Sequence, residues 1–296
     1  MTYPIPFDRS FFGAPGELIR LSPLVRRMVA PNPGPMTLVG TCTYVVGQGE
    51  VAIIDPGPDN KEHIAALLAA LRGETVTTIL VTHTHKDHSP AARELKAATG
   101  ARIVGCAPTQ SSGSPIDAAN DFDYVPDTVM RDGDAIEAKN FSLLCVATPG
   151  HTRNHLAFAL PQESALFSGD HVMAWSTSVV APPDGAMRDY MASLEKLLAR
   201  DERIYWPGHG GPVKEPQRFV HALIRHRRER EKAILSCIKA GDSTIAAIVA
   251  HVYAGLDPTL TPAAAYSVLA HIEDLVEQGL VKPEGAVAIG GAFRPA

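Results

Sequence analysis

Residues 81–90 read VTHTHKDHSP and place three histidines and one aspartate within six positions, as His83, His85, Asp87 and His88. Neutral histidines offer nitrogen lone pairs and carboxylates offer oxygen atoms, so these residue types suit a borderline metal ion such as zinc. In an extended chain, His83 and His85 project to the same side and can share one ion. Asp87 and His88 follow where the chain turns and can reach a second ion. Because one metal site needs at least three protein ligands, further donors are expected elsewhere in the sequence.

Three further candidate ligands each follow an apolar run and a glycine. His151 ends the stretch FSLLCVATPGH, Asp170 ends ESALFSGD and His209 ends DERIYWPGH. A glycine beside each donor lets the backbone approach a metal ion closely. Taken singly, each residue is typical of an ordinary turn. The same pattern repeated three times after a His/Asp cluster favours a shared metal centre.

The elements around the cluster are predicted from hydrophobic periodicity. Residues 36–47 and 51–57 are typical of a β-hairpin, and residues 60–73 of an amphipathic helix. Residues 77–83 form a short, nearly all-apolar run that indicates a buried strand, and residues 90–99 indicate a second helix. The cluster therefore lies in a loop between the carboxyl end of a strand and a helix, where open α/β sheets bind ligands.

Other residues near these stretches carry two interpretations. His155 is either a partner of a metal ligand or a buried structural histidine, whereas His171 points away from Asp170 in an extended chain and is not counted as a ligand. Trp175 and Tyr190 are candidates for substrate contact or for the core.

Length and composition narrow the class of protein. A chain of 296 residues with 45% hydrophobic content allows one large domain or two smaller ones. The sequence contains neither an apolar run long enough for a membrane span nor the features of a secretory signal. Four scattered cysteines predict reduced, buried thiols, and together these features predict a cytoplasmic protein with no membrane partner. A net charge of −5 gives no general reason to expect nucleic acid, and the oligomeric state stays open.

A change in composition near residue 215 predicts a domain boundary. Residues 217–240 carry seven Lys or Arg against two acidic residues, whereas residues 241–296 carry two basic against six acidic residues. The change follows the Gly- and Pro-rich stretch GHGGPVKEP. We therefore expect a first domain over residues 1–215, then a linker helix and a second domain over residues 216–296.

The complete pattern resembles the metallo-β-lactamase superfamily, from about residue 30 to residue 215. The resemblance implies an α/β fold, an αββα sandwich of two mixed sheets with helices outside. It also implies two Zn²⁺ ions per chain. Within it, Asp170 bridges the ions and Asp55, in the stretch IIDPG, supports the metal loop. The remaining ligands would be His83, His85 and His151 for the first ion and Asp87, His88 and His209 for the second.

Two features resemble one branch, the β-lactamase-like protein 2 family. The stretch NPGPMTLVGTCTYVVG resembles the start of that family, although its members often have Asn where Cys42 stands. That family also appends a small winged-helix domain. The C-terminal third fits such a domain, with helices expected over residues 218–241, 243–254 and 262–278 and two short strands around residues 283–285.

The site implied by the resemblance is open and net positive, and it would generate hydroxide from water and stabilise developing anionic oxygen. Such a centre suits hydrolysis of a phosphodiester, a thioester, a lactone or an amide. On family grounds the first expectation is a phosphodiester, with single-stranded RNA as the candidate substrate. The alternative is a small ester, thioester or lactone, as in glyoxalase II. Asp87 is the candidate catalytic residue that passes a proton to the leaving group.

Two alternative functions belong to classes of protein other than hydrolases. A mononuclear iron persulfide dioxygenase uses part of the same ligand set, so spacing leaves this alternative open. A non-catalytic winged-helix protein that reads DNA sequence is disfavoured. Its recognition helix would be residues 262–278, which contain three acidic residues and no Lys or Arg.

The basic segment around residues 225–230 has its own two interpretations. Arg225, Arg227, Arg228 and Arg230 lie beside Glu229 and Glu231, which favours ion pairing on a solvated helix face. The alternative is that some of these arginines and His226 face the metal cleft and bind a phosphodiester backbone.

Overall fold

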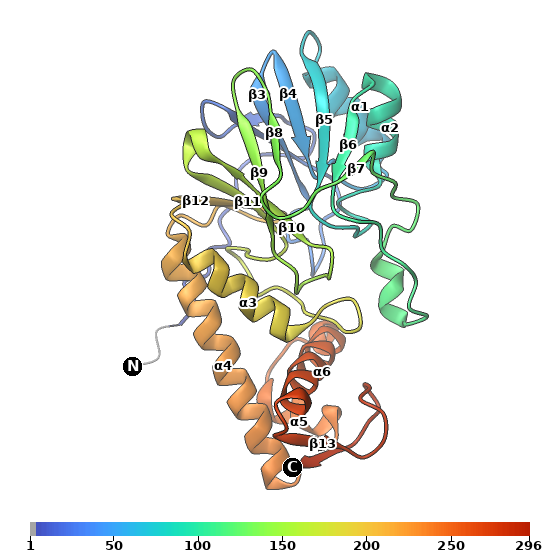
Figure 1. The fold of residues 1–296 in the computed structure, drawn as a ribbon, viewed down its shortest axis with the longest axis vertical. Helices are drawn as coiled ribbons and strands as arrows, with labels where there is room; N and C mark the ends of the chain where they lie inside the picture. The colour runs from blue at the N-terminus through green and yellow to red at the C-terminus, as the bar shows by residue number, and fades with distance from the viewer. Residues whose placement is uncertain (1–3) are drawn as a thin grey trace.

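The computed structural model describes residues 4–296, and the first part of these residues forms two stacked β-sheets with helices outside (Figure 1). The larger sheet has the strand order β1-β2-β3-β4-β5-β6-β7, and the smaller sheet has the order β12-β11-β10-β9-β8. This arrangement confirms the α/β class and the αββα sandwich expected from the sequence. The strands of the larger sheet are β1 (Ile19–Arg20), β2 (Val25–Val29), β3 (Cys42–Gln48), β4 (Glu50–Ile54), β5 (Thr75–Val81), β6 (Arg102–Gly105) and β7 (Thr128–Val129). Those of the smaller sheet are β8 (Ala135–Glu137), β9 (Ser142–Ala147), β10 (Leu156–Leu160), β11 (Ala165–Gly169) and β12 (Ile204–Pro207).

The elements before the His/Asp cluster follow the sequence pattern. Strands β3 and β4 form the predicted hairpin, with Gln48 opposite Glu50. Strands β4, β5 and β6 pair in parallel, because helix α1 (Lys61–Ala70) and helix α2 (Ala91–Thr99) connect them. The side chain of Asn60 caps α1, and Gly100 ends α2 in the left-handed conformation. The metal-loop residues directly follow β5, as expected.

Strand direction in the smaller sheet brings three distant loops together. Strand β10 is antiparallel to both β9 and β11, and β11 is parallel to β12. Strands β9, β11 and β12 therefore run in the same direction, and their carboxyl ends lie at one edge of the sheet. At that edge the backbone N–H of Cys42 donates to the carbonyl of Gly208 at 2.7 Å, which ties the two sheets together. In the core between the sheets, the rings of Tyr44 and Phe167 pack 5.1 Å apart.

The C-terminal part is a small helical domain with a two-stranded wing. It contains α5 (Ile245–Val252), α6 (Thr261–Glu277) and the antiparallel strands β13 (Val281–Pro283) and β14 (Phe293–Pro295). Its own core includes Ile248, Val268 and Phe293. This is the winged helix expected from the sequence.

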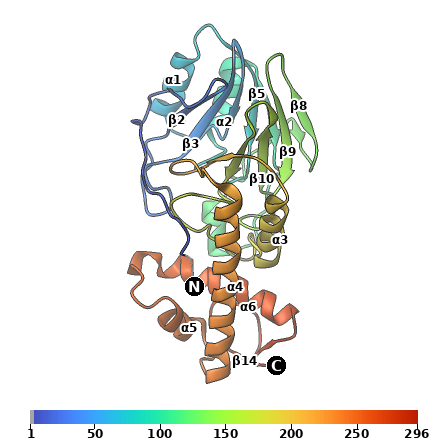
Figure 2. The ribbon, with the colours of Figure 1, turned by 90° about the vertical axis from the view of Figure 1, so that its left-hand side faces the viewer.

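Helix α4 (Pro216–Ala240) joins the two parts and is shared by their cores (Figure 2). Its first half, including Phe219 and Leu223, packs with helix α3 (Met187–Leu198) of the sandwich. Its second half, including Ile234 and Ile238, belongs to the C-terminal core. The division at residue 215 coincides with the start of this helix and stays a prediction about folding units.

Two further observations concern the whole described chain. The four cysteines are free thiols, three of them buried. Over residues 4–296, the helices are too short or too polar to cross a bilayer.

Candidate metal centre

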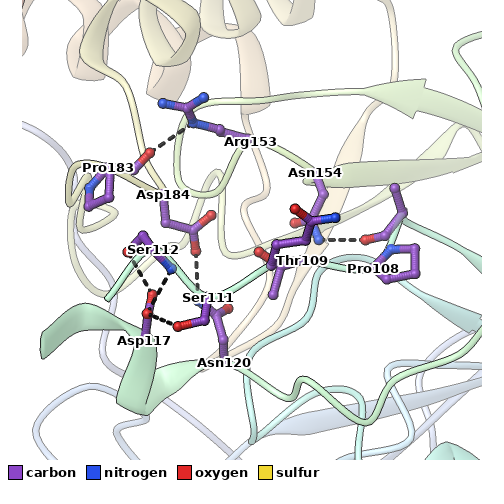
Figure 3. Close-up of a pocket in the computed structure, with 12 residues that line it drawn as sticks. Pro108, Thr109, Ser111, Ser112, Asp117, Asn120, Arg153, Asn154, Pro183 and Asp184 are labelled. Carbon is purple, nitrogen blue, oxygen red and sulfur yellow. Dashed lines mark hydrogen bonds between the residues drawn. The ribbon is translucent and has the colours of Figure 1, made fainter. Parts of the chain in front are cut away.

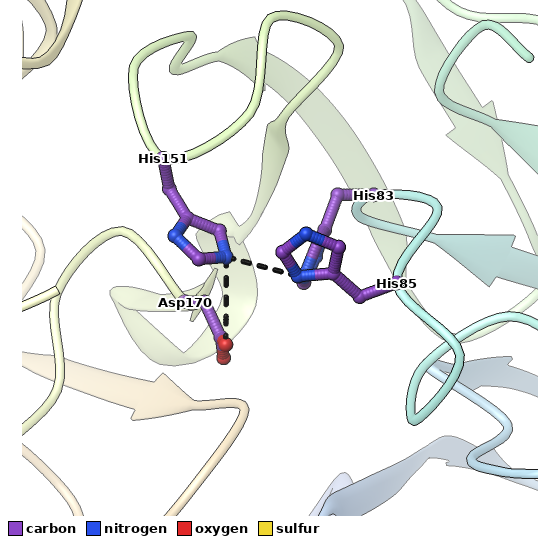
Figure 4. A group of neighbouring side chains, drawn as sticks. All are labelled: His83, His85, His151 and Asp170. Carbon is purple, nitrogen blue, oxygen red and sulfur yellow. Dashed lines mark hydrogen bonds and ion pairs between the residues drawn. The ribbon is translucent and has the colours of Figure 1, made fainter. Parts of the chain in front are cut away.

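All seven candidate ligands from the sequence meet at the edge of the sandwich where β5, β9, β11 and β12 end. The donors fall into two groups, and within each group the donor atoms lie within 4.8 Å of one another. Figure 4 shows the first group, with the ring of His151 contacting both the Asp170 carboxylate and the ring of His85. The first group is His83, His85, His151 and Asp170, and the second is Asp87, His88 and His209.

Asp170 lies between the two groups. Its Oδ2 atom is 3.7 Å from Nε2 of His151 in the first group and 3.4 Å from Nε2 of His209 in the second. Its Oδ1 atom is 3.5 Å from Nε2 of His88. Oδ1 is buried and has no hydrogen-bond partner among the described residues. A buried, ionised oxygen without a partner is costly, so this position calls for a cation.

Hydrogen bonds around the cluster determine which ring nitrogen of two histidines carries the proton. Nδ1 of His151 lies 2.6 Å from the carbonyl of Val179, and Nδ1 of His209 lies 3.2 Å from the carbonyl of Gly40. Because a carbonyl only accepts, each Nδ1 must donate. Each Nε2 therefore faces the centre, and it offers a lone pair to a metal ion when it carries no proton, which is the state a metal ligand requires.

Asp55 determines the same tautomer for two more histidines. Its carboxylate accepts from the backbone N–H and the hydroxyl of Thr82, both at 2.8 Å, and from Nδ1 of His88 at 2.9 Å. The hydroxyl proton of Thr82 is thereby used, so its oxygen accepts from Nδ1 of His83 at 2.9 Å. Nε2 of both histidines is left as a lone pair. Asp55 itself has a φ of +49°, a strained backbone conformation of the kind found where a side chain must be placed for function.

His85 uses its other nitrogen. Its Nδ1 faces the cluster, 3.0 Å from Nε2 of His83 and 3.2 Å from Nε2 of His151. Its Nε2 points outward and lies 3.9 Å from a carboxylate oxygen of Asp184. The first group therefore presents three imidazole nitrogens around one point, a donor set suited to zinc.

The charges of the site favour cations. Burial alone would lower the pKa of His209, but Asp170 and Asp87 outweigh it and raise that pKa to about 10. Burial would raise the pKa of Asp170, but His209 and His88 hold it well below its usual range. Both carboxylates are therefore ionised and attract positive charge. Two divalent ions fit this site, because it offers histidine and carboxylate donors, an unpaired buried oxygen on Asp170 and two negative charges. Which residue binds which ion stays a prediction.

Glycines next to the donors allow close packing, because a side chain at these positions would overlap with neighbouring atoms. A Cβ on Gly208 would lie 2.5 Å from Oδ1 of Asp170 and 2.7 Å from Cε1 of His88. Gly150 has a φ of +139°, and a Cβ there would lie 2.3 Å from Cα of Tyr190. These close approaches explain the run-Gly-ligand pattern in the sequence.

The structure shows the positions of the residues for which the sequence left two interpretations. Nε2 of His155 accepts from the backbone N–H of Asp170 at 3.1 Å, so His155 positions a metal-site carboxylate. His171 lies outside both groups and packs against the buried ring of Tyr190, at 4.6 Å between ring centroids. Trp175 is also buried, and it borders a groove between the sandwich and the C-terminal domain.

The sequence analysis missed several groups that hold the candidate ligands in place. Thr82 directly precedes the motif, and its hydroxyl could have been recognised as a hydrogen-bonding partner of a ligand. The carbonyls of Val179 and Gly40 carry no such signal, because any residue has a carbonyl. Thr41 donates to Oδ2 of Asp87 at 3.1 Å from a loop 46 positions away in the chain. Such contacts depend on the fold and not on side-chain type.

Figure 3 shows a second pocket, of about 580 Å³, whose lining residue Asp184 lies 3.9 Å from Nε2 of His85. Asn120 donates to Asp184 at 3.2 Å across it, and Nε of Arg153 donates to the carbonyl of Pro183 at 2.8 Å. Asn154 donates to the carbonyl of Ala107 at 2.8 Å. Much of the polar lining is thus already paired.

A larger groove of about 720 Å³ is lined by residues of both the sandwich and the C-terminal domain. Its apolar lining includes Met36, Leu38 and Trp175 from the sandwich and Leu256 and Leu260 from the C-terminal domain. Its charged lining is Arg9, Arg227, Arg230 and Asp257, and burial lowers the pKa of His226 to about 4, so this ring is neutral. The groove is therefore amphiphilic, with an apolar wall and positive charge.

The basic segment of α4 is only partly available to this groove. Arg227 is buried and donates to the carbonyl of Ser178, and Arg230 donates to the carbonyl of Val252 at 2.7 Å. Arg228 pairs with Glu195 of α3 at 2.9 Å. The predicted ion pairing within α4 is therefore not what these three arginines make: Arg228 pairs with an acidic residue of another helix, and Arg227 and Arg230 hold other segments through backbone carbonyls.

Comparison with known proteins gives two family matches. Residues 36–209 match the metallo-beta-lactamase superfamily, and residues 244–290 match the beta-lactamase associated winged helix domain. The chain is 32% identical to a beta-lactamase-like protein 2 homolog from Drosophila melanogaster, over 89% of this chain and 91% of that protein. It is 33% identical to an atrochrysone carboxyl ACP thioesterase from Aspergillus fumigatus, over 75% of this chain and 67% of that protein. A metallo-beta-lactamase family protein from Thermus thermophilus has a similar fold, with a TM-score of 0.76 at 23% identity, covering 94% of this chain and 100% of that one.

Proposed function

This chain belongs to the metallo-beta-lactamase superfamily and is a metal-dependent hydrolase, and we propose that it uses two zinc ions to hydrolyse acyl thioesters. The observation that carries the dinuclear part is the position of Asp170 between the two groups: its Oδ2 lies near His151 of the first group and His209 of the second. His83, His85 and His151 would hold one ion, and Asp87, His88 and His209 the other. When bound, such a pair lowers the pKa of water and stabilises anionic oxygen in the transition state.

The ionisation of Asp87 favours a substrate with a good leaving group. Burial alone would raise its pKa, but His88 and His209 hold it well below the usual range. Asp87 therefore starts the reaction ionised and accepts a proton from the attacking water before it can return one. A thiol has a pKa of about 8.5, so the thiolate released when the C–S bond breaks needs little help from an acid. Water and thioester thus give a carboxylate, a thiol and one proton: one proton of the water passes through Asp87 to the thiolate, and the other leaves the new carboxyl group for solvent.

Two further features support an acyl thioester. The groove beside the centre offers the apolar wall that an acyl chain requires and positive charge for an anionic carrier arm. One relative that the chain resembles over most of its length is named an ACP thioesterase. We also place the protein in the cytoplasm, a proposal consistent with its four free cysteines.

Single-stranded RNA is the second candidate substrate. It is favoured by the combination of Arg9 and Arg230 with the aromatic ring of Tyr253 in the groove, since basic and aromatic groups together bind single strands. It ranks second because Arg230 already donates to a backbone carbonyl and stacks on Tyr253, at 4.7 Å from its ring centroid.

The test begins with metal content, measured by plasma mass spectrometry on protein purified without added metal or chelator. Two zinc ions per chain are expected, and one iron per chain would indicate the dioxygenase instead. The zinc protein is then assayed with acyl thioesters of several chain lengths, an oxygen ester, a lactone and a single-stranded RNA. Thioester hydrolysis with the highest kcat/KM supports the proposal. RNA cleavage without thioester hydrolysis overturns it in favour of the second candidate.

A further inference from the structure

The groove between the two domains is built from both of them. The sandwich contributes Leu38 and Trp175, and the C-terminal domain contributes Leu256, Leu260 and Ala263. Leu260 ends the short 3₁₀ helix η3 (Pro258–Leu260), and Ala263 lies in the first turn of α6. Without the C-terminal domain, one wall of this groove would be missing.

Helix α6 occupies the place of the DNA-recognition helix in a winged helix, but here it faces the sandwich (Figure 1). It packs against α3 and α4, and Arg188 of α3 forms ion pairs with Asp274, at 3.4 Å, and with Glu277 of α6. Ser267, Ala270 and six further residues of α6 are buried. A helix that is covered and acidic in this way serves contacts within the molecule.

The inner end of the groove lies next to the metal centre. Ser178 and Val179 line it, and the Val179 carbonyl accepts from Nδ1 of His151. Trp175 also lines it and packs against Gly210, where a Cβ would lie 2.7 Å from its ring. Gly210 directly follows His209. The lining of the groove therefore contacts residues of the metal centre, although the seven candidate ligands themselves are not among the residues that line it.

The chemistry of the groove indicates which molecule it binds. Its volume of about 720 Å³ is in the range of small-ligand sites. The apolar wall suits an alkyl or aromatic acyl group. Arg9 is exposed and lines the same groove, so it complements an anionic group of the substrate, such as the phosphate of a phosphopantetheine arm.

We propose that the C-terminal domain is a specificity element, whose residues Leu256, Leu260 and Ala263 form the wall that receives the acyl group of a thioester carried on a phosphorylated arm. This inference rests on the proposed function, because it assigns the substrate of the same metal site. It gives the winged helix a role in substrate selection instead of DNA recognition.

The test measures binding of thioether analogues, which have the acyl carbonyl replaced by CH₂ and cannot be hydrolysed. S-alkyl phosphopantetheines of 4, 8 and 12 carbons are titrated against the full-length zinc protein by calorimetry. In the wild type, each additional buried methylene is expected to lower Kd about fourfold, equivalent to ~0.8 kcal/mol, until the groove is full. Arg9→Gln should weaken the phosphorylated analogues severalfold and leave unphosphorylated ones unchanged.

Ala263→Phe places a ring in the groove, and Ala250→Phe is its matched control on the exposed face of α5, outside the groove. We expect Ala263→Phe to raise Kd for the 12-carbon analogue at least tenfold and to leave the 4-carbon analogue unchanged. Ala250→Phe should change neither. If Ala263→Phe fails to fold, Leu260→Ala replaces it, with weaker binding of the 12-carbon analogue as the expected result.

The outcomes separate this inference from the proposed function. Hydrolysis of short thioesters without chain-length-dependent binding overturns the inference alone. Chain-length-dependent binding that Ala263→Phe abolishes, without any thioester hydrolysis, supports the groove and overturns the proposed activity. Equal effects of Ala263→Phe and Ala250→Phe overturn the assigned wall, and preferential binding of single-stranded RNA in the groove overturns its occupant.

Discussion

Replacing Asp55 by Asn tests whether hydrogen bonds around the centre set its metal affinity. The carboxylate of Asp55 accepts from the Thr82 backbone, from the Thr82 hydroxyl and from Nδ1 of His88. In the Asn variant, the amide oxygen can still accept from the Thr82 backbone. The amide NH₂ then faces His88 and the Thr82 hydroxyl, where it can only donate. His88 must accept at Nδ1, so its proton moves to Nε2, the atom that faces Asp87 and Asp170.

The hydrogen bonds that this substitution removes set the expected size of the effect. Two hydrogen bonds to a buried charge are worth about 1.5–3 kcal/mol each, and the Asn amide recovers part of this, so we expect the free energy of unfolding to fall by roughly 2–4 kcal/mol. Loss of a group that orients a metal ligand typically weakens metal binding by about 10–100-fold. The ion held by His88 should be affected first, because that histidine loses its direct acceptor.

Zinc affinity is measured by competition with a chromophoric chelator, and the protonation of His88 by nitrogen NMR of the imidazole. Asp127→Asn is the matched control, since Asp127 also accepts from a side chain and a backbone N–H but lies on the surface away from the centre. Unchanged zinc affinity together with an Nδ1–H signal for His88 in the Asp55→Asn variant would refute the tautomer argument.

Three further predictions concern other residues. Asp170→Ala should lower metal-dependent kcat/KM by about 100-fold or more, because the two groups of imidazoles lose the carboxylate between them; turnover at the wild-type rate would contradict the bridging role. Burial, with nearby arginines, lowers the pKa of His271 to about 3 from an ordinary value of 6.5, so its neutral form is favoured on folding. Its contribution to stability is complete above about pH 6.5 and is lost as the pH falls toward 3, with a loss of about 2 kcal/mol by pH 5. Urea unfolding at pH 7 and pH 5 should therefore show a smaller loss of stability in His271→Leu than in the wild type, and equal losses would count against it. Gly208→Ala places a methyl group against Asp170 and His88 and should reduce bound zinc below two ions per chain, whereas Gly290→Ala, which meets no atom within 4 Å, should leave metal content unchanged.

The sequence alone was enough to predict the class of fold and to single out the candidate ligand residues that meet at the centre. Whether a side chain can bind a metal ion depends on its type, so candidate ligands can be recognised without coordinates. These are His83, His85, Asp87, His88, His151, Asp170 and His209. The hairpin, the strand before the metal loop and the C-terminal helices were also predictable, because hydrophobic periodicity and glycine stops act over short distances along the chain.

The tertiary structure decided the rest. The tautomers of His151 and His209 depend on the carbonyls of Val179 and Gly40, which the sequence cannot single out because every residue has a carbonyl. The pairing of Arg228 with Glu195 joins two helices 33 positions apart, where the local pattern predicted pairing within one helix. The groove exists only because α4 folds the C-terminal domain against the sandwich and directs α6 inward. Such contacts join residues distant in sequence, and the packing of the whole chain determines which of them form.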